Sequence, residues 1–161
     1  MLIRKAHIDE AAKACDVLRR SILELCGADH HDNPAIIRRW LANKTPAVVG
    51  SWIAHPDNVV LVAVEGETVL GIGIVRNDGE ITCNYVSPDA RFRGVSKAML
   101  ALLETAARSH GNDVCHLIST ETAHRLYLSA GYEDCGVPQG KFGTTSSFPM
   151  LKQLAAESSN P

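Results

Sequence analysis

The sequence has no apolar run long enough to cross a membrane, since its longest such run extends only from Val59 to Val64. A bilayer-spanning helix needs about 20 consecutive apolar residues. The amino-terminal residues also lack the apolar segment of a signal peptide, because charged residues occur at Arg4, Lys5 and Asp9. We therefore expect a cytoplasmic protein that does not bind membranes.

A surplus of positive charge is also absent. The chain of 161 residues has 16 Lys and Arg against 18 Asp and Glu, a formal net charge of -2. Proteins that bind DNA or RNA neutralise phosphates with a basic surface, so we expect no nucleic-acid partner. The length and the 45% hydrophobic fraction indicate one domain with a sizeable core. We expect that domain over residues 1–152 and a frayed carboxyl-terminal tail over residues 153–161.

Cysteine is present, but its pattern is not that of a disulfide framework or a zinc site. The five cysteines are widely spaced, and no Cys-x-x-Cys pair occurs. Most have apolar neighbours, which indicates small core side chains. The adjacent His30 and His31 have no evident third ligand. We therefore expect no metal.

Hydrophobic periodicity predicts strands and helices in a definite order: strand, two helices, three strands, helix, strand, helix, two strands. Strands are predicted over residues 2–6, 59–64, 69–75, 81–86, 114–119, 132–137 and 148–151. Helices are predicted from Asp9 to Gly27, from Pro34, after Gly94 and after Thr120. The helix after Gly94 is expected to bury Val95, Met99, Leu102, Leu103 and Ala106. Residues 44–56 are expected to form an irregular connection.

The segment from Val86 to Leu100 is the most informative part of the chain. Pro88 ends a strand, and Gly94 precedes an amphipathic helix, with Arg91 and Arg93 between them. The first N–H groups of a helix have no intrahelical partners, and the helix dipole attracts anions there. Arginine adds positive charge, and glycine lets a ligand approach the backbone. The segment therefore predicts a ligand that carries a phosphate group.

A second motif follows on a later helix, which has Tyr127 on its apolar stripe and Gly131 at its end. Together the two segments resemble the GCN5-related N-acetyltransferase (GNAT) superfamily. Its acetyl-CoA motif, Val-x-Pro-x-x-(Arg/Gln)-x-x-Gly-x-(Gly/Ala), is matched by Val86, Pro88, Arg91 and Gly94. Its later motif, Ala-x-x-(Leu/Phe)-Tyr-x-x-x-Gly-(Phe/Tyr), is matched by Ala123, Leu126, Tyr127, Gly131 and Tyr132. Ser96 departs from the first motif, where the family prefers glycine or alanine.

The resemblance implies an α/β (α+β) GNAT fold, with a central mixed, mostly antiparallel twisted sheet of about seven strands flanked by about four helices. It implies acetyl-CoA as cosubstrate, with the pyrophosphate at the turn and the pantetheine arm between strands 81–86 and 114–119. The implied acetyl-CoA contacts are Tyr85, Val86, Arg91, Phe92, Arg93, Gly94, Val95, Ser96 and Tyr127.

The implied reaction is direct attack of a primary amine on the thioester. An exposed N–H near Val86 would polarise the thioester oxygen, and Tyr127 would donate a proton to the departing thiolate. From the spacing of the residues alone, Tyr127 is expected to fill the apolar stripe of its helix; the match to the family motif is what favours the catalytic role. Many relatives have a glutamate on the strand before the first motif, but no carboxylate lies between Glu80 and Val86. We therefore expect proton removal through water held by Asn84 or Thr82, or by a residue of the amino-terminal helices.

The acceptor wall is expected near the first two helices, where His30, His31 and Trp40 are candidate binding residues. The alternatives are a solvated loop for the histidines and core packing for Trp40. A looser likeness around Arg20 and Pro34 to a bacterial GNAT subgroup names no substrate. The resemblance also leaves a homodimer open.

Other classes of function remain at this stage. A GNAT-fold domain that binds CoA without catalysis, as a sensor or interaction module, is compatible with the missing carboxylate. An unrelated nucleotide-binding fold is opposed by the absence of Gly-x-x-x-x-Gly-Lys-(Ser/Thr) and of Gly-x-Gly-x-x-Gly after a strand. The acceptor, a small amine or a protein amine, is not identified by the sequence.

Overall fold

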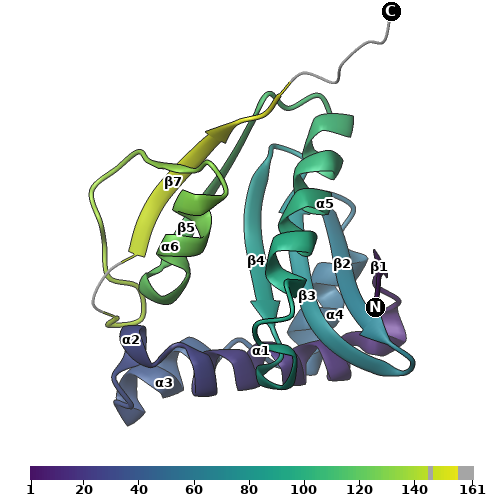
Figure 1. Ribbon diagram of the computed structural model, residues 1–161. Coiled ribbons are helices and arrows are strands. Elements are labelled where there is room, and N and C mark those ends of the chain that lie inside the picture. Colours follow the sequence, from purple (N-terminus) through teal and green to yellow (C-terminus); the bar gives the residue numbers. More distant parts are fainter. Residues whose placement is uncertain (145–146, 156–161) are drawn as a thin grey trace, which may run out of the picture.

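The computed structural model describes residues 1–144 and 147–155. Its centre is a seven-stranded mixed sheet with the order β1-β2-β3-β4-β5-β7-β6 (Figure 1). The strands are β1 (Leu2–Lys5), β2 (Asn58–Glu65), β3 (Thr68–Arg76), β4 (Glu80–Val86), β5 (Val114–Thr120), β6 (Glu133–Asp134) and β7 (Ser147–Gln153). The helices are α1 (Ala11–Leu25), α2 (Gly27–His30), α3 (Pro34–Leu41), α4 (Pro46–Ala54), α5 (Val95–Ser109) and α6 (Glu121–Ser129). Short 3-10 turns occur at Ile8–Glu10 and Pro88–Ala90.

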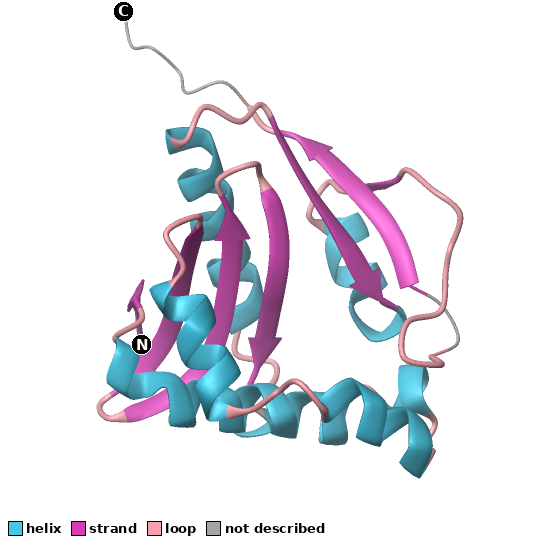
Figure 2. Ribbon diagram, turned by 180° about the vertical axis from the view of Figure 1, so that it is seen from behind, coloured by secondary structure: helices cyan, strands magenta, loops and turns pink. Residues whose placement is uncertain are grey.

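Helices cover both faces of the sheet because the strands are buried on both sides. In β2, Val60, Val62 and Val64 pack in the cluster that contains side chains of α1 and α4. The alternate residues Leu61 and Ala63 belong to a second cluster, which contains side chains of α5. This follows from the two-residue period of a strand. Figure 2, seen from behind, shows α1 and α4 on the side opposite to α5.

The predicted succession of strands along the chain is confirmed, but two short helices were not predicted. The structure has α2 immediately after α1, so Gly27 begins a helix where we expected only the end of one. It also has α4 where we expected an irregular connection. Thr45 caps α4, since its hydroxyl accepts a hydrogen bond from the Val48 N–H, and Pro46 occupies the favoured first position. The prediction of about four helices was therefore too low.

Three local predictions were wrong for identifiable reasons. Helix α1 begins at Ala11 and not at Asp9, because a 3-10 turn precedes it and Glu10 accepts the His7 N–H there. Leu102 is 41% exposed, since the buried face of α5 runs through Leu100 and Leu103. The strand expected over residues 132–137 is only β6, whose partner β7 contains Pro149, a residue without an N–H. Of the tail expected at 153–161, Gln153 ends β7, and residues 156–161 lie outside the described residues.

Four of the five cysteines are buried, as expected of small core side chains: Cys15, Cys26, Cys83 and Cys115. Cys135 is exposed. Within the described part of the chain, no helix is long and apolar enough to cross a bilayer.

The start of α1 provides a pH-dependent contribution to stability. The Arg4 guanidinium donates to both carboxylate oxygens of Glu10 at 2.8 and 2.9 Å, and this pairing lowers the pKa of Glu10 to about 2. Since the unfolded carboxyl titrates near 4.5, the pair stabilises the fold above that pH and loses its effect as the pH falls towards 2. We expect Glu10→Gln to lower the free energy of unfolding by about 1 kcal/mol at pH 7. Urea denaturation should show that difference disappearing at pH 2 to 3; a pH-independent difference would contradict this origin.

Candidate active site

Strands β4 and β5 are parallel neighbours that separate after a short paired stretch. Their register includes only Glu80↔His116 and Ile81↔Leu117. Beyond these pairs β5 continues with β7 as far as Thr120, while β4 continues with β3 as far as Val86. Figure 1 shows β4 and β5 diverging towards the end of the sheet at which α1 lies. The inner edge of β4 therefore lacks a strand partner from Thr82 onwards.

The opening between the two strands is a cavity of about 240 Å³, here called the splay cavity. Its walls come from α1, β4, the turn before α5, β5 and α6. The predicted site residues that line it are Asn84, Tyr85, Val86, Arg91, Ser96 and Tyr127. The structure thus brings together the carboxyl end of β4, the start of α5 and the tyrosine of α6.

Two backbone N–H groups of β4 face this cavity. The Ser87 N–H donates to Leu70 O of β3 at 2.7 Å. Successive N–H groups of a strand point to opposite edges, so the N–H of Tyr85 also faces β3. The N–H groups of Asn84 and Val86 therefore face the splay, where no strand receives them. They are available to a ligand that extends the sheet.

The side chain of Asn84 also lacks one partner. Its amide nitrogen lies 3.4 Å from Ser96 O, at the start of α5. Its buried oxygen accepts no hydrogen bond from any residue that the structure describes. A buried, unsatisfied acceptor costs about 1–3 kcal/mol, so this oxygen fits a ligand with an N–H or O–H donor. The wall of the splay cavity thus contains backbone N–H groups and a side-chain oxygen that lack hydrogen-bond partners in the described residues.

Tyr127 is a buried phenol on the wall of the splay cavity. Burial raises its pKa to about 12, against a smaller lowering by a hydrogen bond with the Asn84 side chain. The hydroxyl therefore stays protonated across the physiological range and acts as a donor. The ring packs edge-on against Tyr132 with centroids 5.5 Å apart. Burial also raises the pKa of Tyr85, the other phenol of the cavity.

The turn before α5 is open and positively charged. Gly94 has φ of 76° and is the N-terminal cap of α5, and no side chain accepts a hydrogen bond at that cap. Phe92, with φ of 64°, is 89% exposed, and the Arg91 guanidinium lies 4.5 Å from its ring centroid. Arg93 forms an ion pair with Glu65 at 2.6 Å. The first N–H groups of α5 have no intrahelical partners and lie beside Arg91 and the Arg93–Glu65 pair, which favours an anion there.

The predicted residues of this turn differ in what they can contact. Phe92, Arg93, Gly94 and Val95 do not line the splay cavity. Val95 is buried in the α5 core cluster, so only its backbone can face a ligand. Arg91 and Ser96 do line the cavity and connect it with the turn.

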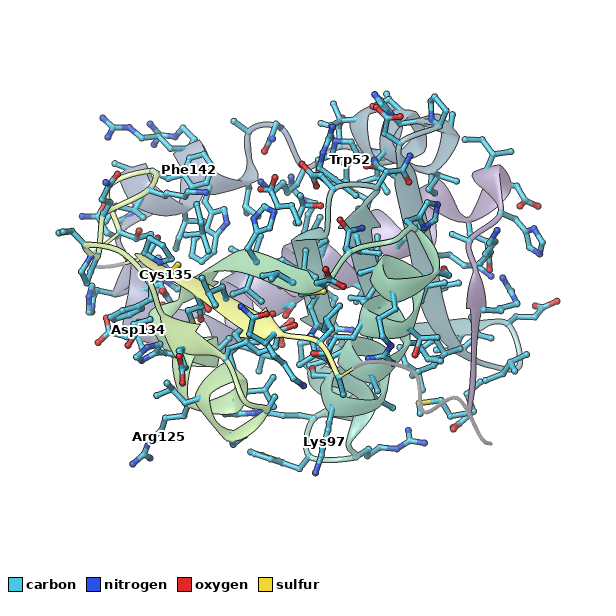
Figure 3. All side chains as sticks on the ribbon, turned by 90° about the horizontal axis from the view of Figure 1, so that it is seen from above. Trp52, Lys97, Arg125, Asp134, Cys135 and Phe142 are labelled. Carbon is cyan, nitrogen blue, oxygen red and sulfur yellow. The ribbon has the colours of Figure 1, made fainter. Side chains whose placement is uncertain are left out.

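A second cavity, of about 320 Å³, is here called the acceptor cavity. Five residues line both cavities: Thr82, Cys83, Tyr85, Ile118 and Thr120. The two cavities therefore meet where β4 and β5 separate. Trp52 and Phe142 belong to the acceptor cavity, and Figure 3 shows them on the side opposite to Lys97, which is in the first turn of α5.

The candidates near α2 require correction. His30 is fully buried, where its Nε2 lies 2.9 Å from Ile22 O and its Nδ1 accepts the Asp32 N–H at 3.0 Å. Neither His30 nor His31 lines either cavity. The expected solvated loop is a short helix whose Asp29 is buried instead. Trp40 does line the acceptor cavity, stacked with Phe142 at 6.4 Å.

Asp29 joins α2 to the helix that carries Tyr127. Its carboxylate accepts from the Glu121 N–H at 2.7 Å, the Thr122 N–H at 3.2 Å and the Thr122 hydroxyl. It thereby satisfies the first turn of α6 and complements the helix dipole. We expect Asp29→Ala to lower the free energy of unfolding by about 2–3 kcal/mol, because these buried donors lose a charged acceptor.

Chemical denaturation measures this loss. The matched control is Asp16→Ala, because Asp16 is exposed on α1 and the substitution should lower stability by less than about 0.5 kcal/mol. Equal stability of the two variants would contradict the role assigned to Asp29.

Most residues of the acceptor cavity were not predicted from the sequence. Lys44, Asn58, Arg76, Lys141 and Phe142 line it, although none belongs to a motif. They come from separate connections and strand ends that only the fold brings together. Within the described residues, no group of three His, Cys, Asp or Glu side chains is placed to hold a metal ion.

Comparisons with known proteins agree with this geometry. A family model described as "Acetyltransferase (GNAT) domain" matches residues 29–154. The comparison with curated proteins found no significant match. A solved GCN5-related N-acetyltransferase from Rhodopseudomonas palustris is similar with a TM-score of 0.84 and 20% identity, over 95% of each chain.

Two further solved structures share the fold. The PaiA N-acetyltransferase from Thermoplasma acidophilum, in complex with coenzyme A, has a TM-score of 0.82 and 19% identity over 95% of this chain and 98% of that one. YncA from Salmonella typhimurium, with acetyl-CoA, has a TM-score of 0.74 and 22% identity over 100% and 98%.

Proposed function

The chain belongs to the GNAT acetyltransferase family, and on that premise we propose that it transfers an acetyl group from acetyl-CoA to a primary amine. The observation that carries this proposal is the junction of two cavities where β4 and β5 separate. One cavity leads to the anion-binding turn, and the other is free for an acceptor. The junction would bring an amine and a thioester together, with Tyr127 on the wall.

The splay cavity fits the pantetheine arm of acetyl-CoA. The amide groups of this arm can pair with the unpartnered Asn84 N–H of β4, which leaves the Val86 N–H for the thioester and the Asn84 side-chain oxygen for a water molecule. The pyrophosphate would lie at the start of α5, near the backbone N–H groups and Arg91. The solved relatives PaiA, with coenzyme A, and YncA, with acetyl-CoA, support the choice of ligand.

The reaction we propose is direct attack of the neutral amine nitrogen on the thioester carbonyl carbon. The Val86 N–H stabilises the negative charge that forms on the carbonyl oxygen. The carbon–sulfur bond then breaks, and the sulfur receives a proton for which the Tyr127 hydroxyl is the donor. The attacking nitrogen loses a proton, so the products are an N-acetyl amine and CoA thiol. Tyr127 regains its proton from solvent.

Proton removal from the amine is assigned to water. Asp29 is the only carboxylate among the described residues that line the two cavities, and its oxygens are occupied at the start of α6. An amine with a pKa of about 10.4 is mostly protonated at pH 7, so its deprotonation must be assisted. Thr82 lines both cavities and Asn84 has an unpartnered oxygen, so these side chains can hold that water.

Release of free CoA thiol from acetyl-CoA tests this function. Purified protein is incubated with acetyl-CoA and single amines, and mass spectrometry of the amine checks that one acetyl group is gained for each thiol released. Amine-dependent release with an acetylated product is the expected result. Binding of acetyl-CoA without release for any small or protein amine would instead identify a noncatalytic CoA-binding domain.

A further inference from the structure

The acceptor cavity is positively charged, which restricts the amine that it can bind. Its wall contains three cationic side chains, Lys44, Arg76 and Lys141, and one carboxylate, Asp29. The Asp29 charge is directed to the N–H groups of α6, where it accepts three hydrogen bonds. The cations therefore dominate the field inside the cavity.

Arg76 and Lys141 have no polar side-chain partner within the described part of the chain. Among the residues described, no ion pair or hydrogen bond involves the side chain of Arg76 or Lys141. Arg76 is half-buried at the end of β3, opposite Asn58 of β2. A planar guanidinium in such a position is suited to bind a carboxylate through two parallel hydrogen bonds.

The third cation, Lys44, lines the acceptor cavity and interacts electrostatically with Cys83 of the junction. Lys44 donates to the Asn43 side chain at 2.7 Å, and its ammonium is 5.2 Å from the ring centroid of Phe142. Burial lowers its pKa, while the Cys83 thiol of the junction acts in the opposite direction and Lys141 lowers it further. An anion beside Lys44 would relieve this repulsion and replace lost hydration. It would also leave an attached amine near the thioester.

The rest of the wall suits a small molecule with an apolar part. Trp40 and Phe142 stack at 6.4 Å, and Trp52 adds a third aromatic ring. The volume of about 320 Å³ is at the lower end for small-molecule sites. The Asn58 side-chain oxygen is buried without a partner in the described residues, although its nitrogen donates to Trp52 O at 3.1 Å. The cavity thus combines apolar, cationic and polar surfaces.

Resting on the proposed function, we propose that the acceptor is a primary amine of amino-acid size that also carries a carboxylate. The carboxylate binds among Lys44, Arg76 and Lys141, the apolar part contacts the aromatic rings, and the amine faces the junction. Polycationic amines are excluded by repulsion from the same three side chains.

The effect of the carboxylate is measured with pairs of acceptors, one with and one without this group. Phenylalanine is compared with phenethylamine, and tryptophan with tryptamine, since each pair differs only by the carboxylate. Spermidine represents polycations. We expect kcat/KM for each amino acid to exceed that of its decarboxylated partner by at least about tenfold, with no turnover of spermidine. Faster acetylation of the decarboxylated amines or of spermidine would overturn the inference while leaving acetyl transfer in place.

Substitutions in the acceptor cavity test whether its cations cause the preference for acceptors with a carboxylate. Arg76→Gln and Lys141→Gln should each raise KM for the amino acids by about tenfold and leave KM for the decarboxylated amines within about threefold. Lys5→Gln removes the same charge from an exposed position on β1 and should change neither. Equal changes for amino acid and amine would contradict carboxylate binding at these side chains.

If the protein does not transfer acetyl groups, a binding experiment still tests the carboxylate site. If no acceptor of the panel releases CoA thiol, calorimetric titration of the wild-type protein with phenylalanine and tryptophan still decides the inference. Binding that weakens in Arg76→Gln, but not in Lys5→Gln, supports a carboxylate site. Absence of binding overturns it.

Discussion

Gly94→Glu is expected to abolish acetyl-CoA binding, with an affinity at least 100-fold below that of the wild type. The substitution places a carboxylate at the N-terminal cap of α5, where we propose that the pyrophosphate lies. A negative charge there repels the phosphates and competes for the backbone N–H groups, at a cost of about 3 kcal/mol. A Cβ at this position meets no atom within 4 Å, so the substitution causes no clash, but the φ of 76° makes the backbone of any other residue strained there. Isothermal titration calorimetry with acetyl-CoA measures the loss.

The chain offers a closely matched control at the other end of the same helix. Gly111 follows α5 with φ of 85°, and a Cβ there also meets nothing within 4 Å. Gly111→Glu therefore introduces the same charge and a similar backbone strain. We expect it to lose comparable stability and to bind acetyl-CoA as the wild type does. Unchanged affinity in Gly94→Glu, or an equal loss in both variants, would contradict the assignment of the pyrophosphate to this turn.

Tyr127→Phe is expected to lower kcat by about 100-fold and to change KM for acetyl-CoA by less than about threefold. The substitution removes the hydroxyl that we assign to protonation of the thiolate and keeps the buried ring. Burial holds the pKa of this phenol at about 12, so the hydroxyl is protonated at any pH used for the assay. Steady-state kinetics of thiol release, at saturating acceptor, measures the effect.

Tyr132→Phe is the matched control, since the two rings pack against each other. The Tyr132 hydroxyl donates to Glu104 at 2.8 Å, away from the splay cavity. Its loss should lower the free energy of unfolding by about 1–3 kcal/mol and leave kcat unchanged. Wild-type kcat in Tyr127→Phe would show that the phenol only fills the stripe of α6.

The sequence predicts the turn and its helix because their geometry is determined by nearby residues. Pro88 ends β4, and Gly94 adopts a positive φ that other residues rarely adopt. The start of α6 is also local, since the Thr120 hydroxyl accepts the Ala123 N–H as expected of a cap. The fold class follows from the order of such elements, and the structural relatives confirm it.

The acceptor side was not predictable in the same way. Helix α4 has apolar residues on several sides, so no helical stripe marks it, although Thr45 and Pro46 signal its start. His30 and His31 stood out in the sequence, whereas Asp29 is the side chain that reaches α6. The cations of the acceptor cavity are far apart in the chain. Their meeting depends on the register of β2 with β3 and on the course of the loop before β7.

Residue-resolved amide hydrogen exchange, measured by NMR with and without saturating acetyl-CoA, tests whether the cosubstrate binds along the free edge of β4. We predict that exchange at the Asn84 and Val86 N–H groups slows at least about tenfold, because these groups then donate to the ligand. The Ser87 N–H, which already donates to Leu70 O, should exchange as before. Unchanged exchange at Asn84 and Val86 under saturation would contradict binding between β4 and β5.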